Sequence, residues 1–360
     1  MNTVGFNQYL SDHVYENLVK KDDFFRKLNE LVDWYELSFD LKKLGQNDHG
    51  GRPRYSPVLM FKMLFLSFLY DISDRETEDI CNNHIRCKYF IGLEITAPAP
   101  DYSSLSVLRQ EIIDKLGADW ITVVFRKIIA AALQADIQFG KIQSIDSTHT
   151  LANVDIHKDK ERQANGEEPR DPDAAWGCKG IETKLTVAGE KVAVKKYFYG
   201  YKSHLLAETD HGLITALAVS PGNEADVEGG DRLLNQKLTR AEQSRIGWVT
   251  GDKAYGCAVL ISLLEKDKGI KTAFGLNSGF LKGVYAERWR QYLADEERTA
   301  ARKLRYVVER VNADLKNHHS LKKCRYLGLA KYHFQATMAA LAFNLKRMTT
   351  LLTGARFKPI

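Results

Sequence analysis

The sequence predicts an α/β protein with a mixed β-sheet, preceded by a helical N-terminal domain. Three observations support this class. Apolar residues recur at three- and four-residue spacing through residues 7–37, a pattern typical of amphipathic helices. After residue 140, the first strand-like segments follow one another closely, and a short turn joins two of them. Later strand-like segments alternate with helical ones, so antiparallel and parallel neighbours are both expected in one sheet.

The N-terminal domain is expected to cover residues 1–137. The apolar run at 58–70 carries Lys62 and is too short to span a bilayer, so it predicts a buried helix. A loop with glycine and proline at 49–57 precedes that helix. Short helices joined by tight turns can form a helix-turn-helix that binds DNA, although many helical cores have the same pattern.

Two helix starts in this domain have recognisable capping residues. Ser73 and Glu76 have the spacing of a capping box, in which each side chain bonds to the other residue's backbone N–H. A further helix is expected at about 101–112, with Ser103 or Ser104 as its N-cap.

The second domain is expected to cover residues 138–360. It contains a polar insertion at about 155–195, in which residues 157–177 have almost no large apolar side chains and predict a surface loop. The expected strands are 143–151, 195–209, 212–223, 245–252 and 270–276. The expected helices are 224–238, 257–269, 294–318 and 327–352.

Composition limits the classes of function. The formal net charge is +6, and the stretch 298–360 holds fourteen Lys or Arg against two acids. Such a C-terminal region is either a footprint for a polyanion or a set of helices with a solvated basic face. The five scattered cysteines do not suggest a disulfide framework, and the first residues lack a signal-peptide pattern, so we expect a cytoplasmic protein with no membrane partner.

Three acidic residues stand out by their positions. Asp146 lies inside a predicted strand, Asp252 lies at the end of another, and Glu309 is one of the two acids in the basic stretch. Taken alone, an Asp beside Ser and Thr often only ends a strand or caps a turn. Carboxylates from three separate elements can instead hold two divalent cations, which clamp the attacking and leaving oxygens of a phosphodiester. Surrounding basic residues would then bind the phosphate backbone.

Several segments together resemble the DDE transposases of bacterial insertion sequences, in the four/five-type superfamily and most closely its five-type branch. The segments are "YSPVLMFKMLFLSFLYDISDRETED", "SIDST", "FYGYKSHLLAETDHGLITALAVSPGNEADV", "VTGDKAYG" and the R-x3-E-x6-K pattern of Arg305, Glu309 and Lys316. The wider group often has Tyr three residues before that Arg, where this chain has Arg302. The resemblance covers most of the chain.

The resemblance implies a ribonuclease-H-like catalytic domain with Asp146, Asp252 and Glu309 as catalytic residues and as ligands of two Mg²⁺ or Mn²⁺ ions. It also implies that Arg305 and Lys316 lie near DNA phosphates. The implied activity is cleavage at the element's ends to expose 3′-hydroxyls, followed by strand transfer into target DNA. Terminal inverted repeats and target DNA are the implied partners, and joining two ends suggests a homodimer or larger synaptic complex. The protein would associate with the nucleoid when bound to DNA.

Other residues near these acids have two readings. Lys202 and Lys253 could contact DNA, as could Tyr255, or could be ordinary polar positions of strand and loop. His149 and His204 could support the site or only line a half-buried strand face. Away from the acids, Cys81, His84 and Cys87 have helical spacing, but a zinc site usually needs a fourth ligand and a loop between ligand pairs. Trp176 is expected to anchor the polar insertion rather than to meet DNA.

Two alternatives to a transposase remain at this stage. A related metal-dependent nuclease would use the same three acids without strand transfer. A catalytically silent relic would bind DNA only, although three intact acids argue against it.

Overall fold

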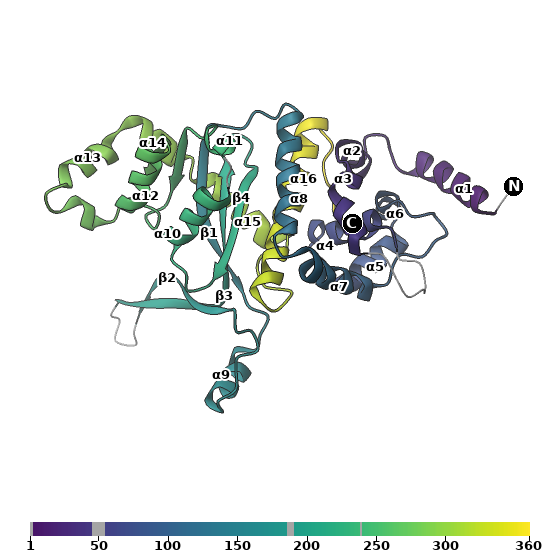
Figure 1. Ribbon diagram of the computed structural model, residues 1–360, viewed down its shortest axis with the longest axis horizontal. Helices are drawn as coiled ribbons and strands as arrows, with labels where there is room; N and C mark the ends of the chain where they lie inside the picture. The colour runs from purple at the N-terminus through teal and green to yellow at the C-terminus, as the bar shows by residue number, and fades with distance from the viewer. Residues whose placement is uncertain (1–2, 45–54, 186–190, 238–239) are drawn as a thin grey trace. The chain divides into compact units, whose positions relative to one another are not determined.

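The computed structural model describes residues 3–44, 55–185, 191–237 and 240–360 (Figure 1). The predicted loop at 49–57 falls mostly outside these residues. The chain divides into two compact units. The first comprises residues 1–136, 318–320 and 337–360, and the second comprises residues 137–317 and 321–336. The boundary drawn from sequence, between 137 and 138, stays a prediction.

The first unit is helical. Its elements before residue 136 are α1 (Thr3–Leu18), α2 (Phe24–Leu31), α3 (Trp34–Ser38), η1 (Phe39–Leu44), α4 (Pro57–Leu69), α5 (Asp74–Asn83), α6 (Ile85–Ile91), α7 (Tyr102–Glu111), η2 (Ile112–Leu116) and α8 (Trp120–Gln134). None of the described helices of the chain is both long enough and apolar enough to cross a membrane.

Helix α4 is the buried helix that the apolar run at 58–70 predicts. Eleven of its residues are buried, including Lys62. The Lys62 ammonium donates hydrogen bonds to Asn29 Oδ1 and to the carbonyl of Phe90, each at 2.9 Å. Burial lowers the pKa of Lys62 to about 8, and these two acceptors compensate part of the cost of placing the amine there.

The capping box of Ser73 and Glu76 is confirmed at the start of α5. The cap predicted for α7 is wrong: Asp101 is the N-cap, and its carboxylate accepts from the backbone N–H of Ser103. Asp and Ser are about equally good caps, so spacing alone did not decide between neighbouring candidates. His84 ends α5 as its C-cap, so the three residues of the Cys-His-Cys pattern do not share one helix.

The second unit contains a six-stranded mixed sheet. Its strands are β1 (Ile142–Leu151), β2 (Ala175–Leu185), β3 (Lys191–Glu208), β4 (Ile214–Pro221), β5 (Trp248–Gly251) and β6 (Lys271–Phe274). The order is β2-β3-β1-β5-β6, and β4 also pairs with β3. Strand β3 is antiparallel to β1, β2 and β4, whereas β1, β5 and β6 are parallel. The predicted mixed sheet is therefore confirmed.

The expected hairpin of two strands around Asp210 is confirmed as β3 and β4. The buried Glu208 carboxylate fixes this turn, because it accepts hydrogen bonds from the backbone N–H groups of Asp210, His211 and Leu213. Gly212 has φ +66°, a left-handed conformation that glycine adopts without steric cost.

Two parts of the second unit differ from expectation. The polar segment 157–177 is not all loop: Asp155 caps helix α9 (Ile156–Ala164), and strand β2 begins at Ala175. Hydrophobic periodicity could not reveal these elements, because both are exposed over most of their length. The long helix predicted at 294–318 is two helices, α14 (Glu296–Lys303) and α15 (Tyr306–His318), and α13 (Ala286–Ala294) precedes them.

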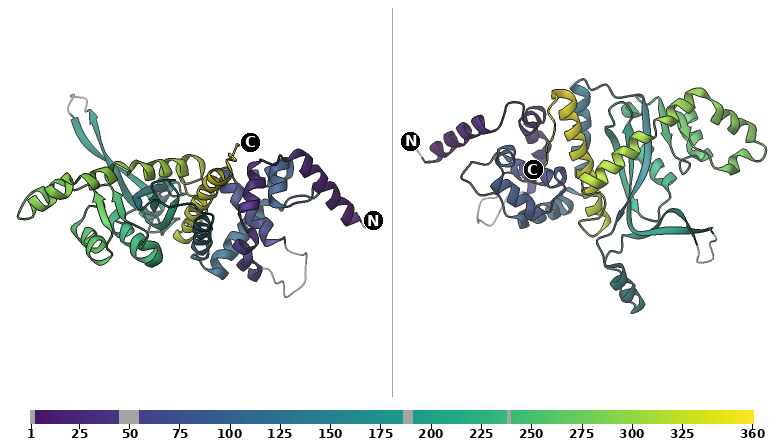
Figure 2. Two further views of the ribbon diagram at one scale, coloured as in Figure 1. Left: turned by 90° about the horizontal axis from the view of Figure 1, so that it is seen from above. Right: turned by 180° about the vertical axis from the view of Figure 1, so that it is seen from behind.

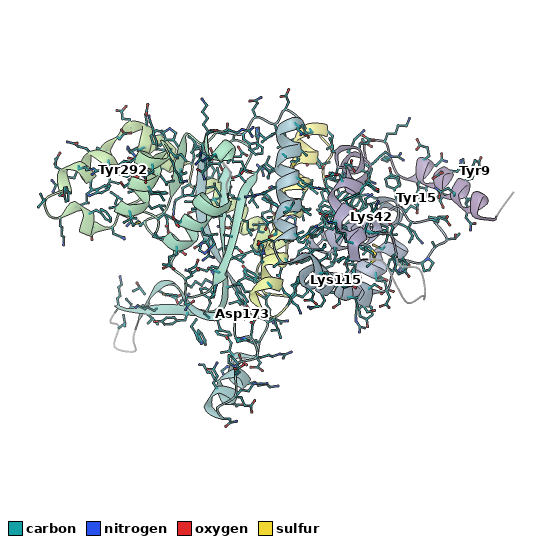
Figure 3. All side chains as sticks on the ribbon, in the orientation of Figure 1. Tyr9, Tyr15, Lys42, Lys115, Asp173 and Tyr292 are labelled. Atoms are coloured by element: carbon teal, nitrogen blue, oxygen red, sulfur yellow. The ribbon has the colours of Figure 1, made fainter. Side chains whose placement is uncertain are left out.

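Helices cover both faces of the sheet (Figures 1 and 2). Helices α10 (Asp226–Asp231) and α12 (Ala258–Ser262) cover one face, and α14 and α15 cover the other. Side chains fill the space between these layers (Figure 3). The core of the unit includes Ile145 of β1, Leu206 of β3 and Leu260 of α12. The remaining elements of the chain are η3 (Arg232–Lys237), α11 (Arg240–Gln243), η4 (Leu263–Asp267), η5 (Ser278–Leu281) and α16 (Leu329–Thr353).

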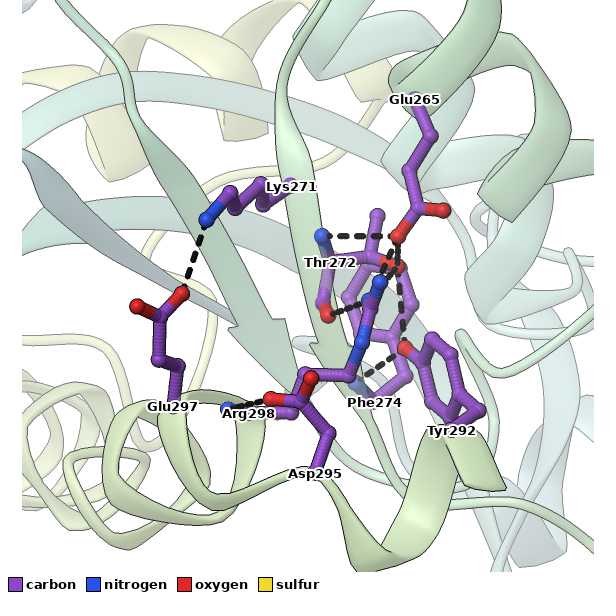
Figure 4. A network of polar contacts seen from close by, with 8 residues as sticks. All are labelled: Glu265, Lys271, Thr272, Phe274, Tyr292, Asp295, Glu297 and Arg298. Atoms are coloured by element: carbon purple, nitrogen blue, oxygen red, sulfur yellow. Dashed lines mark hydrogen bonds and ion pairs between the residues drawn. The ribbon is translucent and has the colours of Figure 1, made fainter. Parts of the chain in front are cut away.

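A polar network fastens α13 and α14 to the edge of the sheet (Figure 4). Arg298 Nη1 donates to Glu265 Oε1 at 2.6 Å and to the carbonyl of Thr272 at 2.5 Å. The Tyr292 hydroxyl accepts from the backbone N–H of Phe274 at 3.0 Å. Arg298 therefore makes its contacts within the protein, although it is the first residue of the basic stretch for which a polyanion is one possible partner.

Candidate active site

Neighbouring parallel strands bring Asp146 and Asp252 close together. In the register of β1 and β5, Ser144 is the partner of Thr250. Asp146 lies two residues further along β1, Asp252 directly follows the end of β5 at Gly251, and the charge of Asp252 acts on Asp146. Adjacent strands lie roughly 4.8 Å apart. The strand pairing therefore brings these two carboxylates to one end of the sheet.

Helix α15 brings further residues to the same place. The Ser144 hydroxyl donates to the carbonyl of Arg305, directly before the helix begins. Further along α15, Asn312 Nδ2 donates to Asp146 Oδ2 at 2.9 Å. Glu309 lies three residues before Asn312 and Lys316 four residues after it, so the three side chains share one helix face.

The environment of Asp146 opposes its negative charge. The pKa of Asp146 is raised to about 6, chiefly by burial and also by the nearby charges of Asp252 and Glu309. Hydrogen bonds from the backbone of Ser147 and from Asn312 act in the opposite direction. A cation bound between these acids would relieve the repulsion among them.

Glu309 forms an ion pair with Arg305 in this structure. Arg305 Nη2 lies 2.8 Å from Glu309 Oε1, and both side chains are nearly half exposed. Arg302, at the position where the wider group often has Tyr, donates to the carbonyl of Leu293 and is partly buried. Arg305 and Glu309 can therefore exchange partners at low cost, while Arg302 is held by α13.

Lys316 belongs to a cluster of cations around His149. Lys316 Nζ lies 3.4 Å from His149 Nδ1. The pKa of His149 is lowered to about 4, chiefly by burial and also by the positive charges of Lys316, Lys179 and Lys202. Burial and the neighbouring Lys179 likewise lower the pKa of Lys316 to about 8. A concentration of positive charge of this kind favours an anion such as a phosphate.

Lys202 is bound within the protein. Its ammonium donates to Asp226 Oδ1 at 2.9 Å and to the carbonyl of Glu224 at 2.8 Å, and its side chain is 14% exposed. Ser147 Oγ donates to the same Asp226 oxygen at 2.8 Å. Asp226 thus connects β1, β3 and the start of α10, and Lys202 has its ammonium engaged before any DNA is present.

Lys253 and Tyr255 follow Asp252 but have different environments. Lys253 is exposed, and its ammonium has no ion-pair partner among the described residues. Tyr255 is fully buried in the core beneath the strands, so it cannot meet DNA directly. Burial raises the pKa of Tyr255 well above its usual value, and the charges of Asp226 and Asp146 add to the effect. Asp252 accepts a hydrogen bond from the backbone N–H of Ala254 at 2.8 Å, which orders this turn.

The donor set fits a hard divalent cation. Three carboxylates could supply oxygen ligands, and Asn312 Oδ1 is a buried oxygen without a hydrogen-bond partner beside Asp146. In the described part of the chain, however, no group of three or more His, Cys, Asp or Glu side chains is arranged to enclose an ion. Glu309 would have to leave Arg305 to join the two aspartates.

Three residues at this site escaped the sequence analysis. Asn312 lies in the glutamate segment but is not acidic, Lys179 lies in the polar insertion, and Asp226 follows the hairpin. A signal existed only for Asn312, because Asn312 has helical spacing with Glu309 and Lys316. Lys179 sits at the irregularity in the pairing of β2 with β3, between Cys178 and Gly180, which no sequence pattern indicates.

A mixed sheet in which β3 is antiparallel to β1, and β1 is parallel to β5 and β6, with helices on both faces, defines a ribonuclease-H-like α/β domain. The family model described as Transposase DDE domain matches residues 142–345, more than half of the chain. The model described as Transposase domain (DUF772) matches residues 13–111. The chain belongs to the DDE transposase family, and this pairing fits the five-type branch of insertion-sequence transposases. It is therefore a DNA-binding transposition enzyme of a family that generally uses divalent metal ions.

Proposed function

We propose that this transposase cuts DNA at the ends of its insertion sequence, exposes 3′-hydroxyls and joins them to target DNA. The observation that supports the proposal is the parallel pairing of β1 with β5, because Asp146 in β1 and Asp252 directly after β5 lie close enough for their charges to interact. The hydrogen bond from Asn312 to Asp146 adds α15, and with it Glu309, to the same site. These are the three acids expected from sequence.

Asp146, Asp252 and Glu309 would hold two Mg²⁺ or Mn²⁺ ions, and ions bound there would activate the attacking oxygen and stabilise the charge that develops on the phosphate. Asn312 keeps Asp146 in one orientation through its hydrogen bond. Arg305 is free to turn to a DNA phosphate once Glu309 leaves the ion pair. Lys316 lies on the same face of α15 as Glu309, two helical turns further along. Its positive charge would contact the same strand of DNA.

The basic residues near the acids differ in how accessible they are to DNA. Arg305 and Lys253 are accessible to a phosphate backbone, and Lys316 is half-buried beside His149. Lys202 would reach DNA only by leaving Asp226, so we assign it first to holding α10 against the strands. The proposed substrates are the terminal inverted repeats and target DNA. Cutting and joining two ends calls for a homodimer or larger synaptic complex, acting at the nucleoid in the cytoplasm.

The test uses a supercoiled donor plasmid that carries both ends of the element. Wild type is compared with Asp146→Asn in Mg²⁺, in Mn²⁺ and in chelator, and cleaved and joined products are separated on a gel. Asp267→Asn, at an exposed position of η4, is the matched control. We expect metal-dependent cleavage and joining in wild type and in the control, and a loss of both by at least a thousand-fold in Asp146→Asn.

The two alternative functions predict different DNA products in this assay. A nuclease without strand transfer would give metal-dependent cleavage and no joined product. A silent DNA-binding relic would retain the donor DNA in a mobility-shift assay but yield no product with either metal. Either result would overturn the proposal.

A further inference from the structure

We propose that one face of the two-stranded ribbon formed by β2 and the first half of β3 binds the DNA backbone within about one helical turn of Asp146. The ribbon consists of Ala175–Leu185 and Lys191–Gly200. This inference rests on the proposed function only in taking DNA as the substrate. It assigns the contact to a surface that neither the three acids nor the motif around Glu309 includes.

The ribbon extends away from the rest of the sheet (Figures 1 and 2). Residues 191–197 of β3 are exposed, and β2 is their strand partner in this part of the sheet. An isolated two-stranded hairpin is marginally stable in water, but β3 continues into the centre of the sheet as the partner of β1. The ribbon is therefore an arm anchored in the catalytic domain.

Strand alternation gives the ribbon two different faces. The residues of β3 on one face alternate with those on the other, and the register places Leu185 opposite Lys191 and Cys178 opposite Tyr197. We call the face that holds Lys191, Lys195 and Tyr197 the lysine face. At the base of the ribbon, Trp176 is opposite Tyr199 on this same face.

The lysine face has unpaired cations next to exposed aromatic and apolar side chains. Tyr197 is 59% exposed and Leu185 is 70% exposed. Neither the Lys191 nor the Lys195 ammonium has an ion-pair partner among the described residues. At the base, Trp176 is 45% exposed, and the Lys160 ammonium of α9 lies 5.5 Å from its ring centroid.

On the opposite face, Lys196 pairs with Glu182 at 2.8 Å, so its charge is already balanced. The neighbouring residues Val192 and Val194 are apolar. Lys191 and Lys195 on the lysine face, by contrast, are exposed and have no such partner among the described residues. Charge complementarity therefore favours a polyanion on the lysine face, and DNA, the proposed substrate, is a polyanion.

The distance along β3 relates the lysine face to the active site. Leu205 is the register partner of Asp146, and Lys195 lies ten residues earlier on the same strand. At about 3.3 Å per residue these residues span at most roughly 33 Å, because the ribbon bends away from the rest of β3 (Figures 1 and 2). A duplex held at Asp146 could therefore reach the lysine face within one turn of B-DNA, about 34 Å, and its major groove can admit a two-stranded ribbon.

The experiment measures binding of a 30-base-pair duplex of mixed sequence to the full-length protein over a range of salt concentrations. The test variant is Lys191→Ala/Lys195→Ala. The control is Lys196→Ala/Lys266→Ala, which removes two charges as well, one from the opposite face of the ribbon and one from an exposed position in η4. Thermal unfolding of each variant checks that the fold is intact, and all four positions are exposed.

Each lysine that contacts a phosphate contributes roughly 0.9 to the slope of log affinity against log salt. We expect the test variant to lose about 1.8 of this slope and at least ten-fold in affinity at low salt. The control should lose less than half as much. Equal losses in both variants would show general electrostatics without a lysine-face contact and would overturn the inference.

A second outcome would also overturn it. If the lysine face binds another copy of this chain, the test variant would change the sedimentation behaviour of the free protein and leave the salt slope intact. The result is separable from the proposed function, because binding measured in chelator does not depend on metal-dependent cleavage or joining. A loss of DNA binding confined to the lysine-face variant therefore reports on the ribbon alone.

Discussion

Asn312 of α15 and Asp146 of β1, which are 166 residues apart in the chain, are joined by a hydrogen bond of 2.9 Å from Nδ2 to Oδ2. Asn312 is buried, with 7% of its surface exposed, and its Oδ1 has no hydrogen-bond partner. This contact couples the helix that carries Glu309 to the strand that carries the first aspartate. We infer that Asn312 is a positioning residue for the site.

Replacing Asn312 should therefore impair chemistry more than binding. A hydrogen bond to a charged group contributes roughly 1.5–3 kcal/mol, so Asn312→Ala should reduce the cleavage rate by roughly 10- to 100-fold while DNA affinity changes little. Asn312→Asp should be worse, because a fourth carboxylate adds to the repulsion around Asp146. Asn317→Ala, an exposed position on the same helix, is the control. Single-turnover rates and duplex affinities measured together would refute the assignment if both fell equally.

The carboxylate of Asp146 should cost stability when no metal is bound. Its pKa is raised from 3.8 to about 6, chiefly by burial. The folded state therefore retains a proton between these values that the unfolded state has lost, and stability falls as the pH rises from about 4 through 6. The difference corresponds to roughly 3 kcal/mol at pH 7.

Asp146→Asn should consequently be more stable than wild type in chelator at pH 7, by up to about 3 kcal/mol in urea denaturation. Below pH 4 the two proteins should have similar stabilities, because Asp146 is then protonated in both states. Adding Mg²⁺ should stabilise wild type and leave the variant nearly unchanged. A variant that is less stable at pH 7 and equally less stable at pH 4 would show that the aspartate is needed for packing.

Close approach of α10 to the sheet depends on glycine. A Cβ atom added to Gly229 would lie 2.2 Å from the buried ring of His204. Because the ring belongs to a buried strand and cannot move away cheaply, Gly229→Ala should destabilise the protein by about 3 kcal/mol. Gly279→Ala, where no heavy atom lies within 4 Å of the added carbon, should change stability by less than about 1 kcal/mol. Thermal unfolding of the two variants side by side tests the claim, and equal stabilities would contradict it.

The sequence could predict those features that rest on local pattern. Strong hydrophobic signals mark the buried helix α4, the hairpin of β3 and β4, strand β1 with Asp146, and strand β5, which Asp252 follows. The exposed helix α9 has no such signal. The break between α14 and α15 at Leu304–Arg305 lacks glycine or proline, so periodicity continued through it.

Contacts between distant segments were beyond prediction for a different reason. The hydrogen bond from Lys202 to Asp226 depends on how α10 packs on the sheet. The ion pair of Glu309 with Arg305 depends on which neighbouring side chain Glu309 contacts. A sequence gives residue types and spacing, whereas these contacts are decided by tertiary packing. The sequence does allow the three acids to be proposed, because acidic side chains are unusual at their positions.

His204 should make stability depend on pH in acid. It is fully buried, its Nε2 lies 2.9 Å from Ser220 Oγ, and burial lowers its pKa from 6.5 to about 4. Lys202 and Arg232, which face the ring, contribute to this lowered pKa, while Asp226 opposes them. Between pH 6.5 and 4 the unfolded chain binds a proton that the folded protein does not. The free energy of unfolding is therefore unaffected by His204 above pH 6.5, and it falls by roughly 3 kcal/mol as the pH approaches 4.

His204→Gln removes this titration and should flatten the dependence between pH 6.5 and 4 by the same amount. The control His157→Gln, at an exposed position of α9, should follow the wild-type curve. His149, whose pKa is also lowered to about 4, contributes equally to all three proteins and cancels in the comparison. The measurement is urea denaturation at half-unit pH steps. Parallel curves for His204→Gln and wild type would mean that the buried ring is charged in the folded state, paired with Glu224, whose Oε1 lies 3.9 Å from Nε2.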